Sequence, residues 1–226
     1  MNRSNGLIFA ADIEERQDLL KIIQQVSHYI DAIKLGNVAL YQNGWSIISE
    51  IKKITNIPII ADLKLMDIPE VAQKLTKAAI NAGADGLMVC GITGGDTILD
   101  CRLLTDNKML FVFTQFTNKT GLISKEMADE YIDLAMAIKC DGIQVPGTKP
   151  ERIKEVKGKI GNKLIIISCG VGAQGPLYGS AIAAGADYEI IGRTIYHSKT
   201  PEIEAQRARD DIRNIVDKNT IKREQL

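Results

Sequence analysis

The stretch Ile57-Pro58-Ile59-Ile60-Ala61-Asp62-Leu63-Lys64-Leu65-Met66-Asp67-Ile68-Pro69 joins an apolar run to three charged side chains. The run up to Ala61 is typical of a buried strand. Charged side chains directly after such a strand are costly to bury, and they persist where they are paired or where they carry out chemistry. Asp62 and Lys64 are two residues apart, so a regular strand would point both to one face. Asp67 falls where a connecting loop begins. This pattern predicts a site at the C-terminal mouth of a parallel sheet.

Strand-like apolar runs recur along the chain, and segments with apolar residues at three- and four-residue spacing separate them. The eight runs are Leu7–Asp12, Ala32–Leu35, Ile57–Leu63, Gly86–Cys90, Met109–Gln115, Gly142–Val145, Leu164–Ser168 and Glu189–Gly192. The helical segments include Glu14–His28, Trp45–Ile54, Ile68–Asn81 and Lys125–Ile138. Strand–helix alternation predicts a parallel sheet, and eight units fit a closed (β/α)8 TIM barrel. We expect residues 1–226 to form this one α/β domain, with the charged tail 217–226 frayed.

The composition narrows the class of protein. Lys+Arg and Asp+Glu both number 28, and this balance argues against a dedicated surface for nucleic acid or for an anionic membrane. The four cysteines show no CxxC spacing, so we expect reduced thiols rather than disulfides or metal ligands. No apolar run approaches the ~20 residues of a membrane span, and the short polar start resembles no signal peptide. We therefore expect a cytoplasmic protein.

The active site of a TIM barrel forms at the C-terminal ends of its strands. Strand 1 ends at Asp12, and strand 2 carries Lys34, which is unusual inside a barrel strand. Lys34 either packs its stem and extends its amine to the rim, or it places a cation beside Asp62 and Lys64 on the next strand. Asp67 also fits a helix N-cap, because Glu70 follows it at the capping-box spacing. Capping and a role in the site are compatible, since a carboxylate has two oxygens.

The residues at the ends of strands 7 and 8 indicate a second feature of the site, a place for a phosphate. Strand 7 runs into Gly170-Val171-Gly172-Ala173-Gln174-Gly175, whose glycines let backbone N–H groups approach an anion. Strand 8 runs into Gly192-Arg193, and a guanidinium there can hold a phosphate through two hydrogen bonds. Loops at these two strand ends form the common phosphate site of such barrels. After strand 5, Thr117 begins a polar loop that either contacts a ligand or only connects two elements. His28 and His197 are isolated, and we expect neither to take part in catalysis.

A phosphorylated small molecule anchored at strands 7 and 8 would place its reacting end over strands 2 and 3. Lysines between two carboxylates keep both carboxylates ionised, and Lys64 should stay protonated. A protonated lysine beside a carboxylate suits a reaction that builds a carbanion and quenches it, such as decarboxylation or enolisation.

These motifs together resemble the orotidine 5′-phosphate decarboxylase family in its shorter archaeal form. The motifs are Lys34 in Ile-Lys-Leu-Gly, Asp62-x-Lys64-x-x-Asp67-Ile-Pro, Gly170-Val-Gly-Ala-Gln174-Gly and Gly192-Arg193. The resemblance runs from Leu7 to about residue 216. It implies conversion of orotidine 5′-phosphate to UMP and CO2, the last step of de novo UMP biosynthesis, with no metal or organic cofactor.

The resemblance also implies a role for each matched residue. Lys64 would deliver a proton to C6 of the pyrimidine, and Asp62 would lie beside the departing carboxylate. Lys34 and Asp12 would contact the ribose, whereas Asp67 would enter the site of the other subunit of a homodimer. The ligand contacts would come from Thr117 at the pyrimidine, and from Gln174, Arg193, Gly172 and Gly192 at the phosphate. Val71 and Cys169 depart from the residues common in the family.

Two other functions remain open on the sequence. One is that of the related Mg²⁺-dependent sugar-phosphate decarboxylases and hexulose-phosphate synthases, which share the Asp-x-Lys-x-x-Asp motif. Those enzymes have a glutamate at the end of strand 2, where this chain has Lys34. A non-catalytic nucleotide-phosphate-binding barrel would need only the site at strands 7 and 8. Such a barrel would have no use for the charges at strands 2 and 3.

Overall fold

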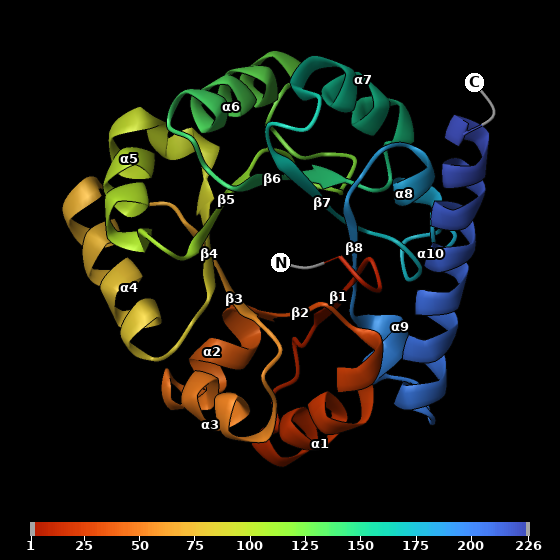
Figure 1. The fold of residues 1–226 in the computed structure, drawn as a ribbon. Coiled ribbons are helices and arrows are strands. Elements are labelled where there is room, and N and C mark those ends of the chain that lie inside the picture. Colours follow the sequence, from red (N-terminus) through yellow and green to blue (C-terminus); the bar gives the residue numbers. More distant parts are fainter. Residues whose placement is uncertain (1–2, 225–226) are drawn as a thin grey trace.

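Eight parallel strands close into a barrel with the order β1-β2-β3-β4-β5-β6-β7-β8, and helices surround it (Figure 1). The computed structural model describes residues 3–224, with side chains described for residues 3–217. Every neighbouring strand pair is parallel, including β1 with β8, which closes the ring. The expected (β/α)8 fold is confirmed.

The elements follow one another in regular alternation. The strands are β1 (Leu7–Ala10), β2 (Ala32–Gly36), β3 (Ile59–Leu65), β4 (Gly86–Cys90), β5 (Met109–Phe113), β6 (Gly142–Pro146), β7 (Ile165–Cys169) and β8 (Tyr188–Ile191). The helices are α1 (Arg16–Val26), α2 (Asn37–Asn43), α3 (Ser46–Ile54), α4 (Pro69–Asn81), α5 (Gly94–Thr105), α6 (Lys125–Ala137), α7 (Pro150–Ile160), α8 (Ser180–Ala183), α9 (Arg193–Tyr196) and α10 (Pro201–Glu224). Two short 3-10 helices are η1 (Ser27–Tyr29) and η2 (Gly91–Thr93).

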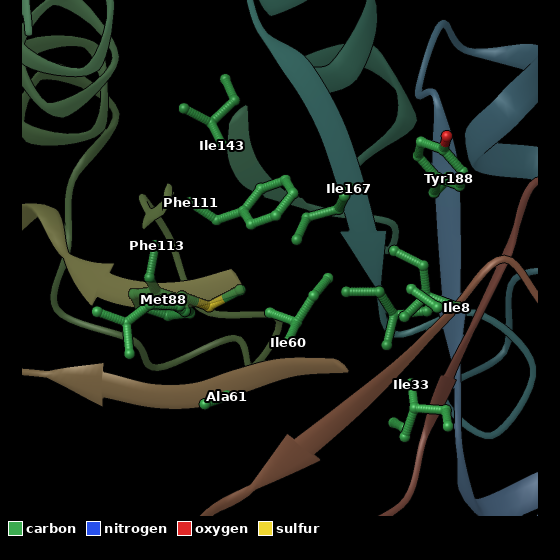
Figure 2. Packing of buried hydrophobic residues seen from close by; sticks show 14 of the residues in the cluster. Ile8, Ile33, Ile60, Ala61, Met88, Phe111, Phe113, Ile143, Ile167 and Tyr188 are labelled. Atoms are coloured by element: carbon green, nitrogen blue, oxygen red, sulfur yellow. The ribbon is translucent and has the colours of Figure 1, made fainter. Parts of the chain in front are cut away.

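Branched and aromatic side chains fill the barrel interior. Figure 2 shows Ile60, Phe111 and Ile167 pointing toward one another from three different strands. All three are fully buried, and burying one such side chain contributes about 1.5–3 kcal/mol. Gly142 on β6 makes room for the aromatic ring, because a Cβ there would lie 2.7 Å from Cε1 of Phe111. The packed interior closes the lower barrel and leaves the C-terminal mouth for a site.

Local sequence signals explain several helix starts. The side chain of Ser124 accepts a hydrogen bond of 3.2 Å from the N–H of Met127 at the start of α6. Pro69 and Pro150 stand at the first positions of α4 and α7, where a missing N–H has no consequence. The sequence did not predict α2, which packs directly after β2 and lies beside α3 on the outside of the barrel (Figure 1).

The C-terminal helix α10 packs against α1, α8 and α9. Its backbone continues to Glu224, whereas the side chains from residue 218 onward and the last two residues lie outside the described part. The expectation of a frayed tail at 217–226 therefore stays a prediction. Within residues 3–224, no helix has both the length and the apolar character needed to cross a membrane.

Candidate active site

A cavity of about 280 Å³ opens at the C-terminal mouth of the barrel. Its wall contains most of the residues that the sequence predicted for the site. They are Asp12, Lys34, Asp62, Lys64, Thr117, Gln174, Gly192 and Arg193. Asp67 and Gly172 are not part of this wall. The two signals, at strands 2 and 3 and at strands 7 and 8, therefore belong to one cavity.

The charged residues form a short network centred on one oxygen. Oδ2 of Asp62 lies 2.9 Å from Nζ of Lys34 and 2.7 Å from Nζ of Lys64. The amine of Lys34 also lies 3.7 Å from Oδ2 of Asp12. Asp62 is 3% exposed and Lys34 is 7% exposed, so the centre of this network is shielded from water. Lys34 thus places a cation in the site, rather than extending its amine to the rim.

Burial and pairing act in opposite directions on these groups. Burial alone would raise the pKa of the Asp62 carboxyl, but the ammonium groups of Lys34 and Lys64 outweigh it and hold that pKa below its usual range. Burial alone would lower the pKa of Lys34, but the carboxylates of Asp62 and Asp12 raise it instead. Both charges therefore persist at neutral pH despite the low exposure.

The other oxygen of Asp62 has no such partner. Oδ1 is buried, and no described residue donates a hydrogen bond to it. A buried carboxylate oxygen without a donor is unusual in a folded protein, and such groups concentrate at functional sites. Asp62 therefore keeps one buried oxygen without a donor in addition to its two ion pairs.

The backbone at Lys64 departs from a regular strand. Its φ is +43°, a region that side chains other than glycine rarely adopt, and the pairing of β3 with β4 shifts register between Ala61 and Leu65. The carbonyl of Lys64 accepts a hydrogen bond of 3.3 Å from Sγ of Cys90. Strand alternation predicted that Asp62 and Lys64 share a face, whereas the structure brings their side chains together through an irregular strand end. Local strain of this kind is typical of functional sites.

Asp12 is held beside β2 by a glycine. The N–H of Gly36 donates to Oδ1 of Asp12 at 3.1 Å. A Cβ on Gly36 would lie 2.1 Å from that oxygen and 3.4 Å from Nζ of Lys34. Glycine is therefore required here for Asp12 to approach the amine.

The loop after β7 is built from glycines in the left-handed region. Gly170, Gly172 and Gly175 have φ values of +90°, +76° and +112°. This loop brings Gln174 to the cavity, and Arg193 reaches it from the start of α9. The N–H of Gly172 instead donates to the carbonyl of Pro176 at 2.8 Å. The expected contact of Gly172 with a phosphate therefore has no support in this arrangement.

Asp67 lies on the surface and does not cap α4. The N-cap of α4 is Ile68 without a side-chain hydrogen bond, so the capping box expected from Asp67 and Glu70 was wrong. Oδ1 of Asp67 accepts from the adjacent N–H of Ile68 at 2.8 Å. Glu70 pairs instead with Lys74 one turn along the helix. Pro69 fixes the first helical turn one residue later than a cap at Asp67 requires.

Several wall residues were missed by the sequence reasoning. Met88, Phe113, Gln144 and Ile190 line the cavity from β4, β5, β6 and β8. They stand inside apolar runs, where the sequence pattern does not distinguish a residue of the cavity wall from a residue of the core. Tyr196, at the end of α9, also lines the cavity.

The cysteines do not supply a nucleophile to the site. All four are free thiols, and burial raises the pKa of Cys169 on the cavity wall to about 11. The protonated thiol is a weak nucleophile. Among the side chains described for residues 3–217, no group of three or more His, Cys, Asp or Glu residues is arranged to hold a metal ion.

The geometry defines a class of (β/α)8 barrel with a lysine–aspartate array at strands 2 and 3, and with Gln174 and Arg193 in the same cavity wall at strands 7 and 8. The family model for the orotidine 5′-phosphate decarboxylase / HUMPS family matches residues 5–208. The chain belongs to this family.

Named relatives agree with this assignment. Orotidine 5′-phosphate decarboxylase of Methanococcoides burtonii is 36% identical over 215 residues, which cover 94% of this chain and 99% of the relative. That of Methanosarcina mazei is 38% identical over 205 residues, covering 89% and 92%.

Solved structures give the same result. The enzyme of Methanocaldococcus jannaschii, in complex with the inhibitor BMP, superposes with a TM-score of 0.86 at 34% identity and covers 91% of this chain and 97% of its own. The enzyme of Pyrococcus horikoshii OT3 gives a TM-score of 0.85 at 32% identity, with 92% and 99% covered. The resemblance stated from the sequence motifs is confirmed.

Proposed function

We propose that this chain converts orotidine 5′-phosphate to UMP and CO2, with Lys64 as the proton donor. The shared oxygen of Asp62 carries this proposal, because it fixes Lys34 and Lys64 beside one buried carboxylate. A barrel that only binds a nucleotide phosphate has no need for this costly arrangement. The relatives named above carry the same activity in their names.

The reaction needs little more than positioned charge. Arg193 and Gln174 hold the 5′-phosphate, and the ribose lies near Lys34 and Asp12, which orients the pyrimidine toward β3. The bond between C6 and the carboxylate breaks, and its electron pair stays on C6. The ammonium of Lys64 stabilises this developing carbanion and then transfers a proton to C6.

The resulting product is UMP with a hydrogen at C6, and Lys64 regains its proton from solvent. The negative charge of Asp62 beside the substrate carboxylate disfavours the bound ground state. This repulsion contributes less to the rate than the stabilisation of the carbanion by Lys64.

The Mg²⁺-dependent relatives are the main competing function. Nζ of Lys34 lies 2.9 Å from Oδ2 of Asp62, and Lys34 occupies the position where those relatives have a glutamate. A fixed ammonium there repels a divalent cation and occupies the carboxylate that would bind it. We therefore infer that this chain decarboxylates without a metal.

The test follows the absorbance of orotidine 5′-phosphate in the presence of EDTA. Full activity is expected, together with a loss of about 10³-fold in Lys64→Ala, which removes the proton donor. UMP should still bind to that variant, which separates loss of chemistry from loss of folding. Inactivity with EDTA and recovery with Mg²⁺ would sink the proposal. Tight UMP binding without turnover would favour a binding protein.

We also propose a homodimer in which Asp67 completes the site of the partner subunit. The carboxylate lies outside its own cavity, and its neighbours Met66 and Ile68 are 70% and 62% exposed. Exposed apolar side chains continue over α5 with Leu99 and Leu103. An apolar surface of this kind is typical of an interface with a second copy.

A further inference from the structure

Gln144 on β6 is a buried polar residue that lines the active-site cavity. The whole residue is 2% exposed. Neither Nε2 nor Oε1 has a hydrogen-bond partner among the described residues. An amide buried in this way without partners is destabilising, and it calls for an explanation from function.

The surroundings of Gln144 are apolar. We use the term cavity floor for Met88, Phe113, Gln144 and Ile190, which line the cavity and are each buried. On the floor, Gln144 stands in register with Phe113 of β5. Its carbonyl accepts a hydrogen bond of 2.6 Å from Oγ1 of Thr114, which fixes the backbone but leaves the amide unpaired. The amide is therefore the polar group of an otherwise apolar floor.

The position of the floor indicates which part of a ligand it meets. Nζ of Lys64 lies 5.6 Å from the ring centroid of Phe113, so the floor adjoins the proton donor. The residues expected to hold the phosphate, Gln174 on the loop after β7 and Arg193 at the start of α9, line the same cavity. A substrate whose phosphate is held by Arg193 and Gln174 points its C6 substituent toward Lys64. The cavity floor adjoins Lys64, so the substituent also points toward the floor.

We propose that Gln144 is a specificity-determining residue that donates a hydrogen bond from Nε2 to the C6 carboxylate of the substrate. This inference rests on the proposed decarboxylase function. An apolar floor with one amide donor accepts the carboxylate before the reaction, and it releases the uncharged CO2 that replaces the carboxylate. Asp62 faces the same substituent with negative charge, so the amide offsets part of that repulsion in the bound substrate.

The proposal makes a distinct kinetic prediction. Charge moves from the carboxylate to C6 as the bond breaks, so the donor binds the ground state more strongly than the transition state. Replacing Gln144 with leucine should therefore raise KM for orotidine 5′-phosphate and leave kcat unchanged or higher. A residue with a purely structural role would lower kcat or leave both constants unchanged.

The experiment compares two ligands by calorimetry. One is UMP, and the other is UMP with a carboxamide at C6, which does not decarboxylate. Gln144→Leu should weaken binding of the carboxamide ligand by about 10-fold or more, whereas UMP binding should change by less than about 2-fold. Ile143→Val, on the same strand but outside the cavity wall, is the control, and it should leave the ratio of the two dissociation constants unchanged.

A second variant keeps the test valid if the leucine variant does not fold. Gln144→Glu has the same size, and its carboxylate can still accept from the carboxamide N–H. It should bind the carboxamide ligand within a few-fold of the wild type, but raise KM for the anionic substrate by about 10-fold or more. The melting temperature of each variant, measured in parallel, checks folding.

Two outcomes would overturn the inference. If the dissociation constants of both ligands rise equally, the amide contacts the pyrimidine ring or only packs within the fold. If neither dissociation constant changes, Gln144 does not contact the C6 substituent. Failure of the proposed function is a different result. In that case the wild-type protein fails to decarboxylate orotidine 5′-phosphate at all, whereas failure of this inference leaves wild-type turnover intact.

Discussion

Nζ of Lys34 lies 2.9 Å from Oδ2 of Asp62, and both residues are buried at the mouth of the barrel. This contact joins β2 to β3 at the same oxygen that pairs with Lys64. A buried pair of this kind contributes little net stability compared with apolar packing, but it leaves a costly lone charge when one partner is removed. The pair therefore ties the protonation of Lys34 and Asp62 to the stability of the fold.

Acid titration should reveal this link. The folded-state pKa of Asp62 lies below its ordinary value of 3.8, so ionised Asp62 favours the folded state above that pH. The contribution is lost as the pH falls through the lowered pKa. The difference in free energy of unfolding between wild type and Asp62→Asn should be constant from about pH 5 to 8 and should change below about pH 4, with the wild type losing stability relative to the variant.

Urea unfolding at a series of pH values measures this difference. A difference that stays constant down to pH 3 would show that the two lysines do not hold Asp62 ionised.

Glycine at position 36 should matter for substrate binding. In Gly36→Ala the new Cβ would lie 2.1 Å from Oδ1 of Asp12, so the Asp12 carboxylate must shift from its place beside Lys34. We expect KM for orotidine 5′-phosphate to rise by about 10-fold, because a small displacement of a positioning group has a large effect. Gly158→Ala in α7 is the control, since a Cβ there meets nothing within 4 Å and should stabilise the helix by about 1 kcal/mol. Unchanged kinetics in Gly36→Ala would exclude a role for the position of Asp12.

The sequence predicted the fold and the charged array because both depend on patterns that are local in the chain. A strand that ends in Asp62 and Lys64 is visible without a structure, and the alternation of elements brings Lys34 to its side. The position of Gln144 is not visible in this way. A glutamine in an apolar strand resembles any other buried residue, and only the packing of the neighbouring strands shows that its buried amide has no partner among the described residues.

Backbone detail was the other limit. The positive φ of Lys64 and the register shift of β3 have no signature in residue types, since lysine is not a residue that favours this conformation. The capping box at Asp67 failed for a related reason. Its spacing fits the motif, but the chain enters α4 one residue later, at Ile68.

Phosphate recognition should depend on the shape of Arg193 as well as its charge. Lysine cannot reproduce the two parallel hydrogen bonds of a guanidinium. In Arg193→Lys we expect the dissociation constant of UMP to rise by about 10-fold, and that of uridine, which lacks the phosphate, to stay the same. Arg16→Lys, in an exposed pair with Glu50, is the control and should change neither constant. A matching loss of uridine affinity would place Arg193 away from the phosphate.

Mixing two inactive variants tests whether Asp67 serves the partner subunit. Lys64→Ala and Asp67→Ala should each be inactive alone. After denaturation and refolding together, about half of the dimers should be mixed, and one of their two sites should carry neither substitution, which restores about a quarter of the wild-type activity. Mixing Lys64→Ala with Asp62→Ala is the control, because these residues belong to one cavity and every site in a mixed dimer stays damaged. Native mass spectrometry verifies that mixed dimers form. If they form without any recovery of activity, Asp67 does not act across the interface, and its exposed position beside Ile68 needs another explanation.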